Sequence, residues 1–276
     1  MHTESWGWRK ATPDVFPIIL DVFKKAGFDG FETHDVDVLQ YLKSEEKFLG
    51  MLSEKGLQLA SIHLAGLTPT TGGFNPFSWF RRTVWQSRWV PKILEFASSV
   101  KGELPVRTVI VGGIHRKEGP KESDFLNTAK ILNKWGKACK EINVEASFHP
   151  FYFNQLVSRE EELSKLCELI DPDLVHLTID IGHCTRCGCN PMEIIQSYKD
   201  WINHVHFRDI SKDGILVQIG DGIIDLKSVY KLLESIGYKG WVIVEHDWVL
   251  LERAKATPVE SAKKAGKFIK TLRTLA

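Results

Sequence analysis

The feature that most constrains this chain is an alternation of short apolar runs with amphipathic stretches along its 276 residues. Eight runs have the length and composition of buried strands, at residues 2–6, 30–33, 58–63, 108–112, 144–149, 175–180, 204–207 and 241–245. Helical patterns separate most of them, at residues 13–26, 44–55, 123–141, 159–169, 191–198 and 226–236, and a closing helix is expected from residue 258 onward. Strands that alternate with helices indicate βαβ units and parallel strands.

Eight such units predict an α/β fold, a (β/α)8 TIM barrel formed by a single domain over residues 1–276. A barrel needs roughly 250 residues, so the length does not require a second domain. An open, doubly wound sheet is the competing architecture. Two near copies at residues 26–30 and 236–240 support the barrel, because each places a glycine, Gly27 or Gly237, where a helix ends before a strand begins.

The least regular segment is the aromatic-rich stretch at about residues 67–90, which contains Trp79, Trp85 and Trp89. It follows the third predicted strand, so in a barrel it belongs to the loops at the C-terminal ends of the strands. We expect this loop to cover a substrate. The alternatives are an insertion packed for stability and a contact between subunits.

Polar side chains stand at the C-terminal ends of the predicted strands, which converge on one site in a barrel. They are Glu32, His34, His63, His149, Asp180, His183, His206, Arg208, Glu245 and Asp247. A single strand-end histidine is more often structural, but the repetition over several strands favours a functional site. Mixed carboxylates and imidazoles are typical ligands of a divalent cation such as Mn, Co, Zn, Fe or Mg. Such an ion stabilises the enediolate of a keto sugar.

Three motifs resemble those of the xylose-isomerase-like barrels, a superfamily that includes sugar isomerases, epimerases and endonuclease IV. They are Ile179-Asp180-Ile181-Gly182-His183 (D-T-G-H in the family), residues 204–209 with the letters H-V-H-F-R-D (H-V-H-L-K-D), and residues 240–247 with the letters G-W-V-I-V-E-H-D. They occur in the family order, and the resemblance spans the whole chain. It implies metal ligands at Asp180, His206 and Glu245.

The fourth ligand implied by the resemblance lies on the fifth predicted strand, where the epimerases carry a glutamate. This chain has the letters S-F-H-P-F at residues 147–151, which resemble the Y-H-P-H segment of the inosose dehydratase branch. His149 is therefore the predicted fourth ligand. Glu145 shares its strand face but lies deeper, and it ranks below His149. Phe151 replaces the second histidine of the dehydratase segment, which leaves the substrate open.

The other polar residues are assigned to catalysis and substrate binding. The predicted catalytic residues are Glu245, His183, Arg208 and Glu32, and the predicted substrate-binding residues are His63, His183, Arg208 and Trp6. Arg208 stands where the family has lysine, and it is expected to bind a carbonyl oxygen or to assist a leaving group. His204 is expected to be structural, and Asp247 to support a metal ligand.

The resemblance implies a metal-dependent lyase or isomerase for a cyclitol or keto sugar, with inosose dehydratase the nearest activity and Mn or Co the favoured ion. A base removes the proton α to the ketone, and the enediolate expels the β-hydroxyl as water. A ketose 3-epimerase or sugar isomerase is the alternative, but those enzymes use a second metal-bound glutamate where this chain has His149. An endonuclease IV-like enzyme and a sugar-binding barrel without turnover are more remote.

Residues 183–189, with the letters H-C-T-R-C-G-C, offer a rival site, a structural zinc knuckle. No second cysteine pair follows, so ordinary thiols are expected at Cys184, Cys187 and Cys189. A net charge of +1 gives no argument for a nucleic acid or an anionic membrane as partner. Five cysteines in a chain of this size, without a visible signal peptide or membrane-length apolar run, favour a cytoplasmic protein. Its oligomeric state is open, with a homo-oligomer as one alternative.

Overall fold

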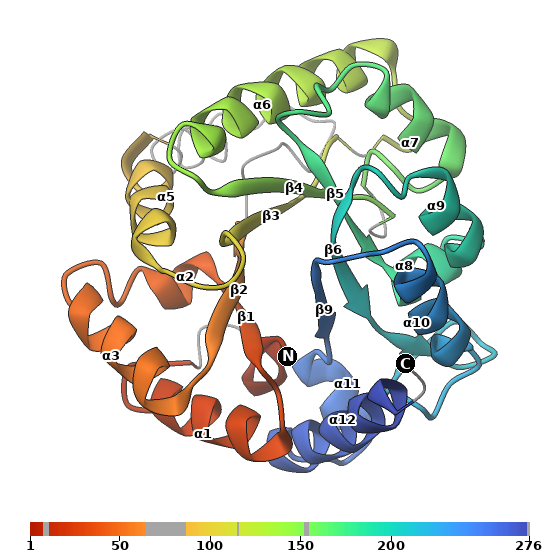
Figure 1. The fold of residues 1–276 in the computed structure, drawn as a ribbon. Coiled ribbons are helices and arrows are strands. Elements are labelled where there is room, and N and C mark those ends of the chain that lie inside the picture. The colour runs from red at the N-terminus through yellow and green to blue at the C-terminus, as the bar shows by residue number, and fades with distance from the viewer. Residues whose placement is uncertain (8–10, 65–86, 115, 152–154, 275–276) are drawn as a thin grey trace.

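The computed structural model describes residues 1–7, 11–64, 87–114, 116–151 and 155–274, which form a ring of strands enclosed by helices (Figure 1). Within this part of the chain, seven strands make one sheet in the order β1-β2-β3-β4-β5-β6-β9, and every neighbouring pair is parallel. They are β1 (Gly30–His34), β2 (Gln58–Leu64), β3 (Arg107–Val111), β4 (Glu145–His149), β5 (His176–Asp180), β6 (Ile202–Phe207) and β9 (Trp241–Val244). The predicted TIM-barrel fold is confirmed.

Helices connect the strands and cover the outside of the ring (Figure 1). The main ones are α1 (Phe16–Ala26), α3 (Glu45–Lys55), α5 (Val90–Ser99), α6 (Glu122–Lys140), α7 (Glu160–Cys167), α9 (Pro191–Ser197), α10 (Leu226–Ser235) and α12 (Pro258–Arg273). Their apolar residues recur at helical spacing, so that one face of each helix is buried against the strands. The predicted glycine turns are confirmed, since Gly27 and Gly237 have φ angles of 88° and 73°. No helix among the described residues is long and apolar enough to cross a membrane.

The prediction of a first strand at residues 2–6 is wrong. Only His2 pairs with the sheet, in a parallel bridge to Glu32, and a 3-10 helix, η1 (Thr3–Trp6), follows it. The chain turns here because His2 Nδ1 accepts the backbone N–H of Glu4 at 2.9 Å. Met1 and His2 nevertheless fill the place between β9 and β1, where His2 N donates to Val244 O at 3.1 Å and Glu32 N donates to Met1 O at 3.0 Å. This two-residue closure is called the seam below.

The aromatic-rich segment predicted at residues 67–90 lies outside the described residues, apart from its last four. Within those four, Trp89 precedes α5, and its ring lies 4.9 Å from the guanidinium of Arg88 and 5.4 Å from Lys92 Nζ. Cover of a substrate by this segment stays a prediction.

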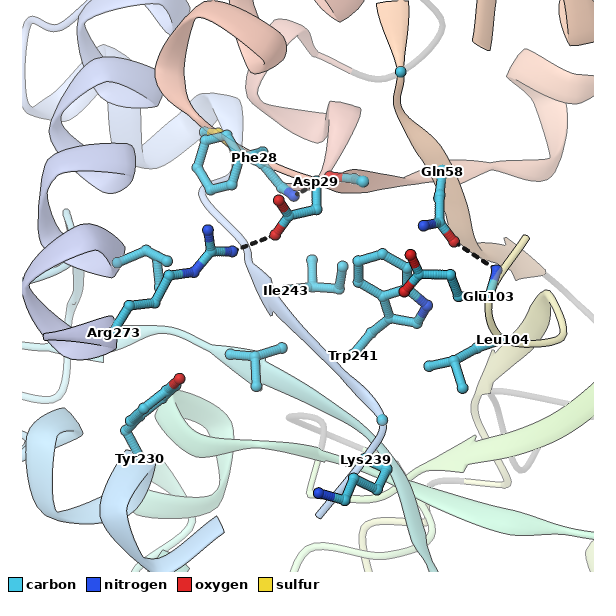
Figure 2. Close-up of a pocket in the computed structure, with 16 residues that line it drawn as sticks. Phe28, Asp29, Gln58, Glu103, Leu104, Tyr230, Lys239, Trp241, Ile243 and Arg273 are labelled. Atoms are coloured by element: carbon cyan, nitrogen blue, oxygen red, sulfur yellow. Dashed lines mark hydrogen bonds and ion pairs between the residues drawn. The ribbon is translucent and has the colours of Figure 1, made fainter. Parts of the chain in front are cut away.

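A cavity of about 580 Å³ opens at the N-terminal ends of β1, β2 and β9, where Gly30, Gln58 and Trp241 line it. Figure 2 shows its rim, with Arg273 paired to Asp29. Barrel enzymes bind substrates at the opposite, C-terminal ends of the strands. This cavity is therefore separate from the candidate site.

Candidate active site

The four predicted metal ligands converge at the C-terminal ends of the strands. His149 and Asp180 end β4 and β5, His206 is the penultimate residue of β6, and Glu245 directly follows β9. All four side chains are buried. His149 Nε2 and His206 Nδ1 each lie 3.8 Å from Asp180 Oδ2, and His206 Nδ1 lies 2.8 Å from Glu245 Oε2.

These distances suit one small cation. Two atoms that each bind an ion at about 2.1 Å lie no more than about 4.2 Å apart, and both separations from Asp180 Oδ2 are shorter. His149 Nδ1 lies 3.0 Å from Pro150 O, and a hydrogen bond to this carbonyl leaves Nε2 as the acceptor. Asp180 caps α8 (Ile181–Arg186), so its Oδ1 accepts the N–H of His183 at 2.8 Å while Oδ2 faces the histidines. Two imidazoles and two carboxylates fit a borderline divalent cation.

Arg208 lies across the carboxylates of this group. Its Nε is 2.8 Å from Asp180 Oδ2, a second nitrogen pairs with Glu245, and Nη1 is 3.4 Å from Asp247 Oδ2. Burial favours the neutral acids, but Arg208 and the nearby imidazoles hold the pKa of Asp180 and that of Glu245 well below their usual range. Both carboxylates are therefore ionised, and Arg208 supplies compensating positive charge.

Glu32 lies one layer deeper in the ring and is fully buried. Its carboxylate faces His204 Nε2 at 2.8 Å, His206 Nε2 at 3.1 Å and His2 Nε2 at 3.2 Å, and it accepts a hydrogen bond from Ser61 Oγ. Burial opposes its ionisation, but these neighbours lower the pKa of Glu32 well below its usual range. The predicted catalytic role of Glu32 is not tested by this arrangement.

His206 consequently lies between two carboxylates. Glu32 is on its Nε2 side and Glu245 is on its Nδ1 side. Burial alone would lower the pKa of His206, but the two carboxylates raise it to about 10. Without a metal ion, the protonated ring of His206 thus supplies positive charge between the two carboxylates. A bound cation beside a neutral His206 ring would supply positive charge at the same place.

Two predicted substrate-binding histidines flank the metal-ligand group. The ring centroid of His63 lies 6.1 Å from that of His149 and 6.2 Å from that of His206. Its Nε2 is buried and has no hydrogen-bond partner among the described residues. The ring of His183 lies 6.0 Å from that of His149. Burial lowers the pKa of His63 to about 3 and that of His183 to about 4, so both rings are neutral at neutral pH.

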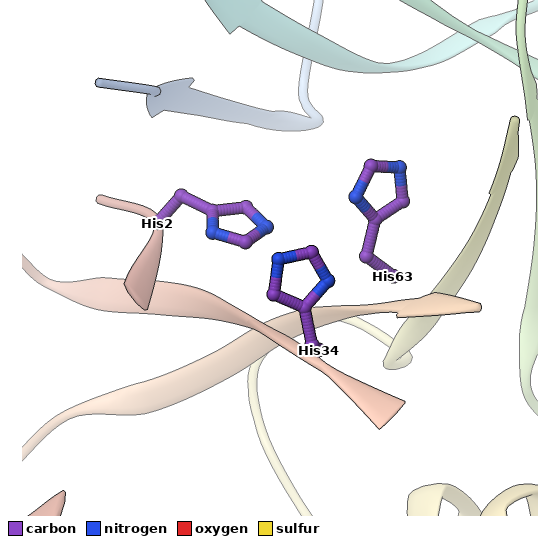
Figure 3. A group of neighbouring side chains, drawn as sticks. All are labelled: His2, His34 and His63. Carbon is purple, nitrogen blue, oxygen red and sulfur yellow. The ribbon is translucent and has the colours of Figure 1, made fainter. Parts of the chain in front are cut away.

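His63 also belongs to a cluster with His34 and His2, shown in Figure 3. The rings of His34 and His63 are stacked, with centroids 5.6 Å apart, and His2 meets both edge-on. His34 Nε2 in turn lies 3.4 Å from Glu4 Oε2. His2 and Glu4 are not among the site residues predicted from sequence.

The pair of Glu4 and His34 predicts a defined pH dependence of stability. Burial opposes charge on both groups, but pairing lowers the pKa of Glu4 from 4.5 to about 2 and raises that of His34 from 6.5 to about 9. The contribution of Glu4 is therefore lost as pH falls from 4.5 through 2, and that of His34 is lost as pH rises from 6.5 through 9. We expect the stability advantage of the wild type over Glu4→Gln, measured by urea unfolding, to be largest between pH 4.5 and 6.5. An advantage that does not change with pH would contradict the pairing.

Two other sequence candidates lie away from the metal-ligand group. Trp6 packs edge-on against Phe23 of α1, with centroids 5.5 Å apart, so its role in substrate binding stays a prediction. Glu145 begins β4, near the opposite end of the ring, where it lies 3.1 Å from Arg107 and accepts from Asn203 at 2.8 Å. This placement agrees with its low rank as a ligand.

The cysteine-rich loop offers a poor site for zinc. Cys184 is buried, and Cys187 donates to Phe151 O at 3.2 Å. Burial raises the pKa of both thiols, whereas zinc binds the thiolate. Among the described residues, no group of three convergent ligand atoms includes a cysteine.

Asp209, the last residue of the H-V-H-F-R-D motif, anchors the loop that follows β6. A short antiparallel hairpin lies here, β7 (Asp209–Ile210) with β8 (Leu216–Val217), which the sequence did not predict. The carboxylate of Asp209 accepts four backbone N–H groups at 2.9 to 3.2 Å, from Ile210, Gly220, Gly222 and Ile224. Gly222 is required for this approach, because a Cβ there would lie 2.1 Å from Asp209 Oδ1.

Asp209→Ala should lower the free energy of unfolding by about 2–3 kcal/mol, because four N–H groups lose their acceptor. Asp213→Ala is the control, since Asp213 is exposed in the same loop. Chemical denaturation measures both variants. Equal stability of the two would show that Asp209 does not anchor the loop.

The comparisons with known proteins agree with the fold. Residues 20–272 match the family model described as xylose isomerase-like TIM barrel. An inosose dehydratase from Clostridium tetani is 36% identical over 166 residues, which are 54% of this chain and 54% of that protein. An inosose dehydratase from Lacticaseibacillus casei is 31% identical over 166 residues, again 54% of this chain and 54% of that protein. The chain thus spans about half the length of the curated relatives that it matches.

Solved structures share the fold at lower identity. A probable 3-DHS dehydratase from Bacillus anthracis has a TM-score of 0.74 and 15% identity, with 95% of this chain and 96% of that chain covered. An IOLI protein with a bound zinc atom has a TM-score of 0.71 and 18% identity, with 92% and 91% covered. The match of the family model over most of the chain shows that this protein belongs to the xylose isomerase-like TIM barrel family.

Proposed function

We propose that this protein is a divalent-metal-dependent lyase or isomerase that acts on a cyclitol or keto sugar through an enediolate, with dehydration of an inosose the most similar reaction. The observation that carries the proposal is the convergence of His149, Asp180, His206 and Glu245, with separations of 3.8 and 2.8 Å. The inosose dehydratases that match half of the chain support the substrate class.

A bound divalent cation would supply Lewis-acid stabilisation of the negative charge that develops on a ketone oxygen. The neutral imidazole of His183 is suited to accept the proton from the carbon next to the ketone. The electron pair of that C–H bond forms the enediolate, and the C–O bond to the β-hydroxyl then breaks. His183 returns its proton to the departing hydroxyl, which leaves as water, while Arg208 donates hydrogen bonds to the oxygens that carry charge. His63 Nε2 binds a substrate hydroxyl.

Epimerisation fits these residues less well. Moving a proton between two faces of a sugar needs a second acid/base group opposite the first. His149 stands where the epimerases carry that glutamate, and Glu145 is engaged by Arg107 and Asn203. Among the described residues, the site therefore lacks the second metal-bound glutamate that the epimerases use beside the equivalent of Glu245.

Elemental analysis of the purified protein, beside His149→Ala and Cys187→Ala variants, tests the proposal. We expect about one Mn, Co, Zn or Fe per chain, lost in His149→Ala and kept in Cys187→Ala. A panel of inososes and keto sugars, assayed for loss of water with the metal-loaded protein, then identifies the substrate. Metal retained in His149→Ala but lost in Cys187→Ala would move the site to the cysteine loop and end the proposal.

A further inference from the structure

The carboxylate of Glu32 faces the Nε2 atoms of three histidines. His204 is at 2.8 Å, His206 at 3.1 Å and His2 at 3.2 Å, all buried. An ionised carboxylate only accepts hydrogen bonds, so the Nε2 atoms of His204 and His206, which hydrogen-bond to it, each carry a proton. In a neutral imidazole the other nitrogen, Nδ1, is then the only one with a lone pair.

His206 and His2 differ in whether they have a lone pair to offer an ion. His206 Nδ1 faces Asp180 and Glu245, so the neutral ring presents its lone pair to the predicted cation. His2 Nδ1 already accepts the backbone N–H of Glu4 at 2.9 Å. In the neutral ring the proton is then on Nε2, so His2 has no lone pair left for an ion.

The spacing of ligand atoms alone does not make this distinction. Four groups of the described chain have three ligand atoms within 4.8 Å of one another, and two of these groups contain His2. One is the cluster of His2, His34 and His63 in Figure 3, and the other joins His2 to Glu4 and Glu245. Both groups lose His2 as a ligand once its proton is placed on Nε2. The group of His149, Asp180 and His206 keeps all three of its ligand atoms.

We propose that Glu32 is a positioning residue that fixes the tautomer of His206 through the hydrogen bond to its Nε2, and so presents Nδ1 of that ring to a divalent cation beside Asp180. This inference rests on the metal dependence proposed above. It replaces a direct role of Glu32 in moving a substrate proton, because the buried carboxylate is occupied by side chains of the protein itself. Partners that orient a metal-bound histidine in this way typically change metal affinity by roughly 10- to 100-fold when they are replaced.

Two substitutions separate hydrogen bonding from packing. Glu32→Gln keeps the shape but turns an N–H group towards the imidazoles, whereas Glu32→Asp keeps an acceptor-only carboxylate and leaves a gap. Competition with a chelator measures zinc affinity. We expect roughly 10- to 100-fold weaker zinc binding in Glu32→Gln and a smaller loss in Glu32→Asp. Greater loss in Glu32→Asp than in Glu32→Gln would show a packing role and overturn the proposal.

Glu145→Gln is the matched control, since Glu145 is a carboxylate of the same sheet that contacts no predicted ligand. It should bind zinc with wild-type affinity. Ring 15N spectra of the zinc-loaded wild type give a second readout that stability does not affect. They should show zinc on Nδ1 of His206 and a proton on its Nε2, and zinc on Nε2 of His206 would overturn the proposal.

The outcomes distinguish this inference from the proposed function. A wild type that binds no metal would end both. Zinc bound by the wild type, lost in Glu245→Gln and held with full affinity by Glu32→Gln would keep the metal site and reject Glu32 as its positioning residue.

Discussion

Glu245→Gln is expected to abolish stoichiometric metal binding and to lower kcat/KM by about a thousandfold. The substitution removes the charge of a predicted ligand whose Oε2 lies 2.8 Å from His206 Nδ1. A Lewis-acid ion stabilises the charge of the transition state by several kcal/mol, and about 4 kcal/mol corresponds to the expected factor. Elemental analysis and steady-state kinetics, on whichever inosose or keto sugar the wild type converts, measure the two effects.

Glu145→Gln again supplies the control, because it makes the same chemical change near the other end of the ring. It should keep its metal and its activity. Retention of both in Glu245→Gln would remove Glu245 from the ligand set.

Arg208→Met should destabilise the metal-free protein by about 3–5 kcal/mol, the range for a buried ion pair that loses one partner. The guanidinium is buried against Asp180, Glu245 and, at 3.4 Å, Asp247. Without it, the first two carboxylates are buried with less compensating charge. Saturating zinc should recover much of the loss, because the ion replaces the missing positive charge.

Urea unfolding with chelator and with excess zinc checks this prediction. Lys165→Met is the control, since Lys165 pairs with Glu122 on the surface, where a single ion pair contributes little. A loss in Arg208→Met that zinc does not reduce would show that Arg208 and the metal do not share the same carboxylates.

The alternation of apolar runs and amphipathic stretches in the sequence was sufficient to locate the strands of the ring. Seven predicted strands agree with the observed ones to within two residues, as for β5, predicted at 175–180 and observed at His176–Asp180. The first run failed for a local reason. Side-chain groups of His2 and Ser5 bond to nearby backbone and turn the chain after one bridged residue, and such bonds leave no periodic signal.

The candidate site also has a part that could be predicted from the sequence and a part that could not. The motif residues were predictable because the ends of parallel strands meet at one edge, which requires no knowledge of the register. The contacts of Glu32 were not, since they join it to Ser61, 29 residues away, and to His204, 172 residues away. These contacts depend on the register of neighbouring strands, which a single sequence does not specify.

The seam between β9 and β1 also ties the site to the local opening of the barrel. Three hydrogen bonds between backbone atoms, donated by Met1 N, His2 N and Glu32 N, close this place, whereas longer ladders join the other strands. The amides of His2 and Glu32 are the two that can be followed here. Hydrogen exchange at these two amides should therefore be faster than in the central strands. Because His2 Nε2 also lies 3.2 Å from the carboxylate of Glu32, each opening removes one neighbour of the carboxylate that hydrogen-bonds to His206, and so couples the opening of the barrel to the predicted metal site.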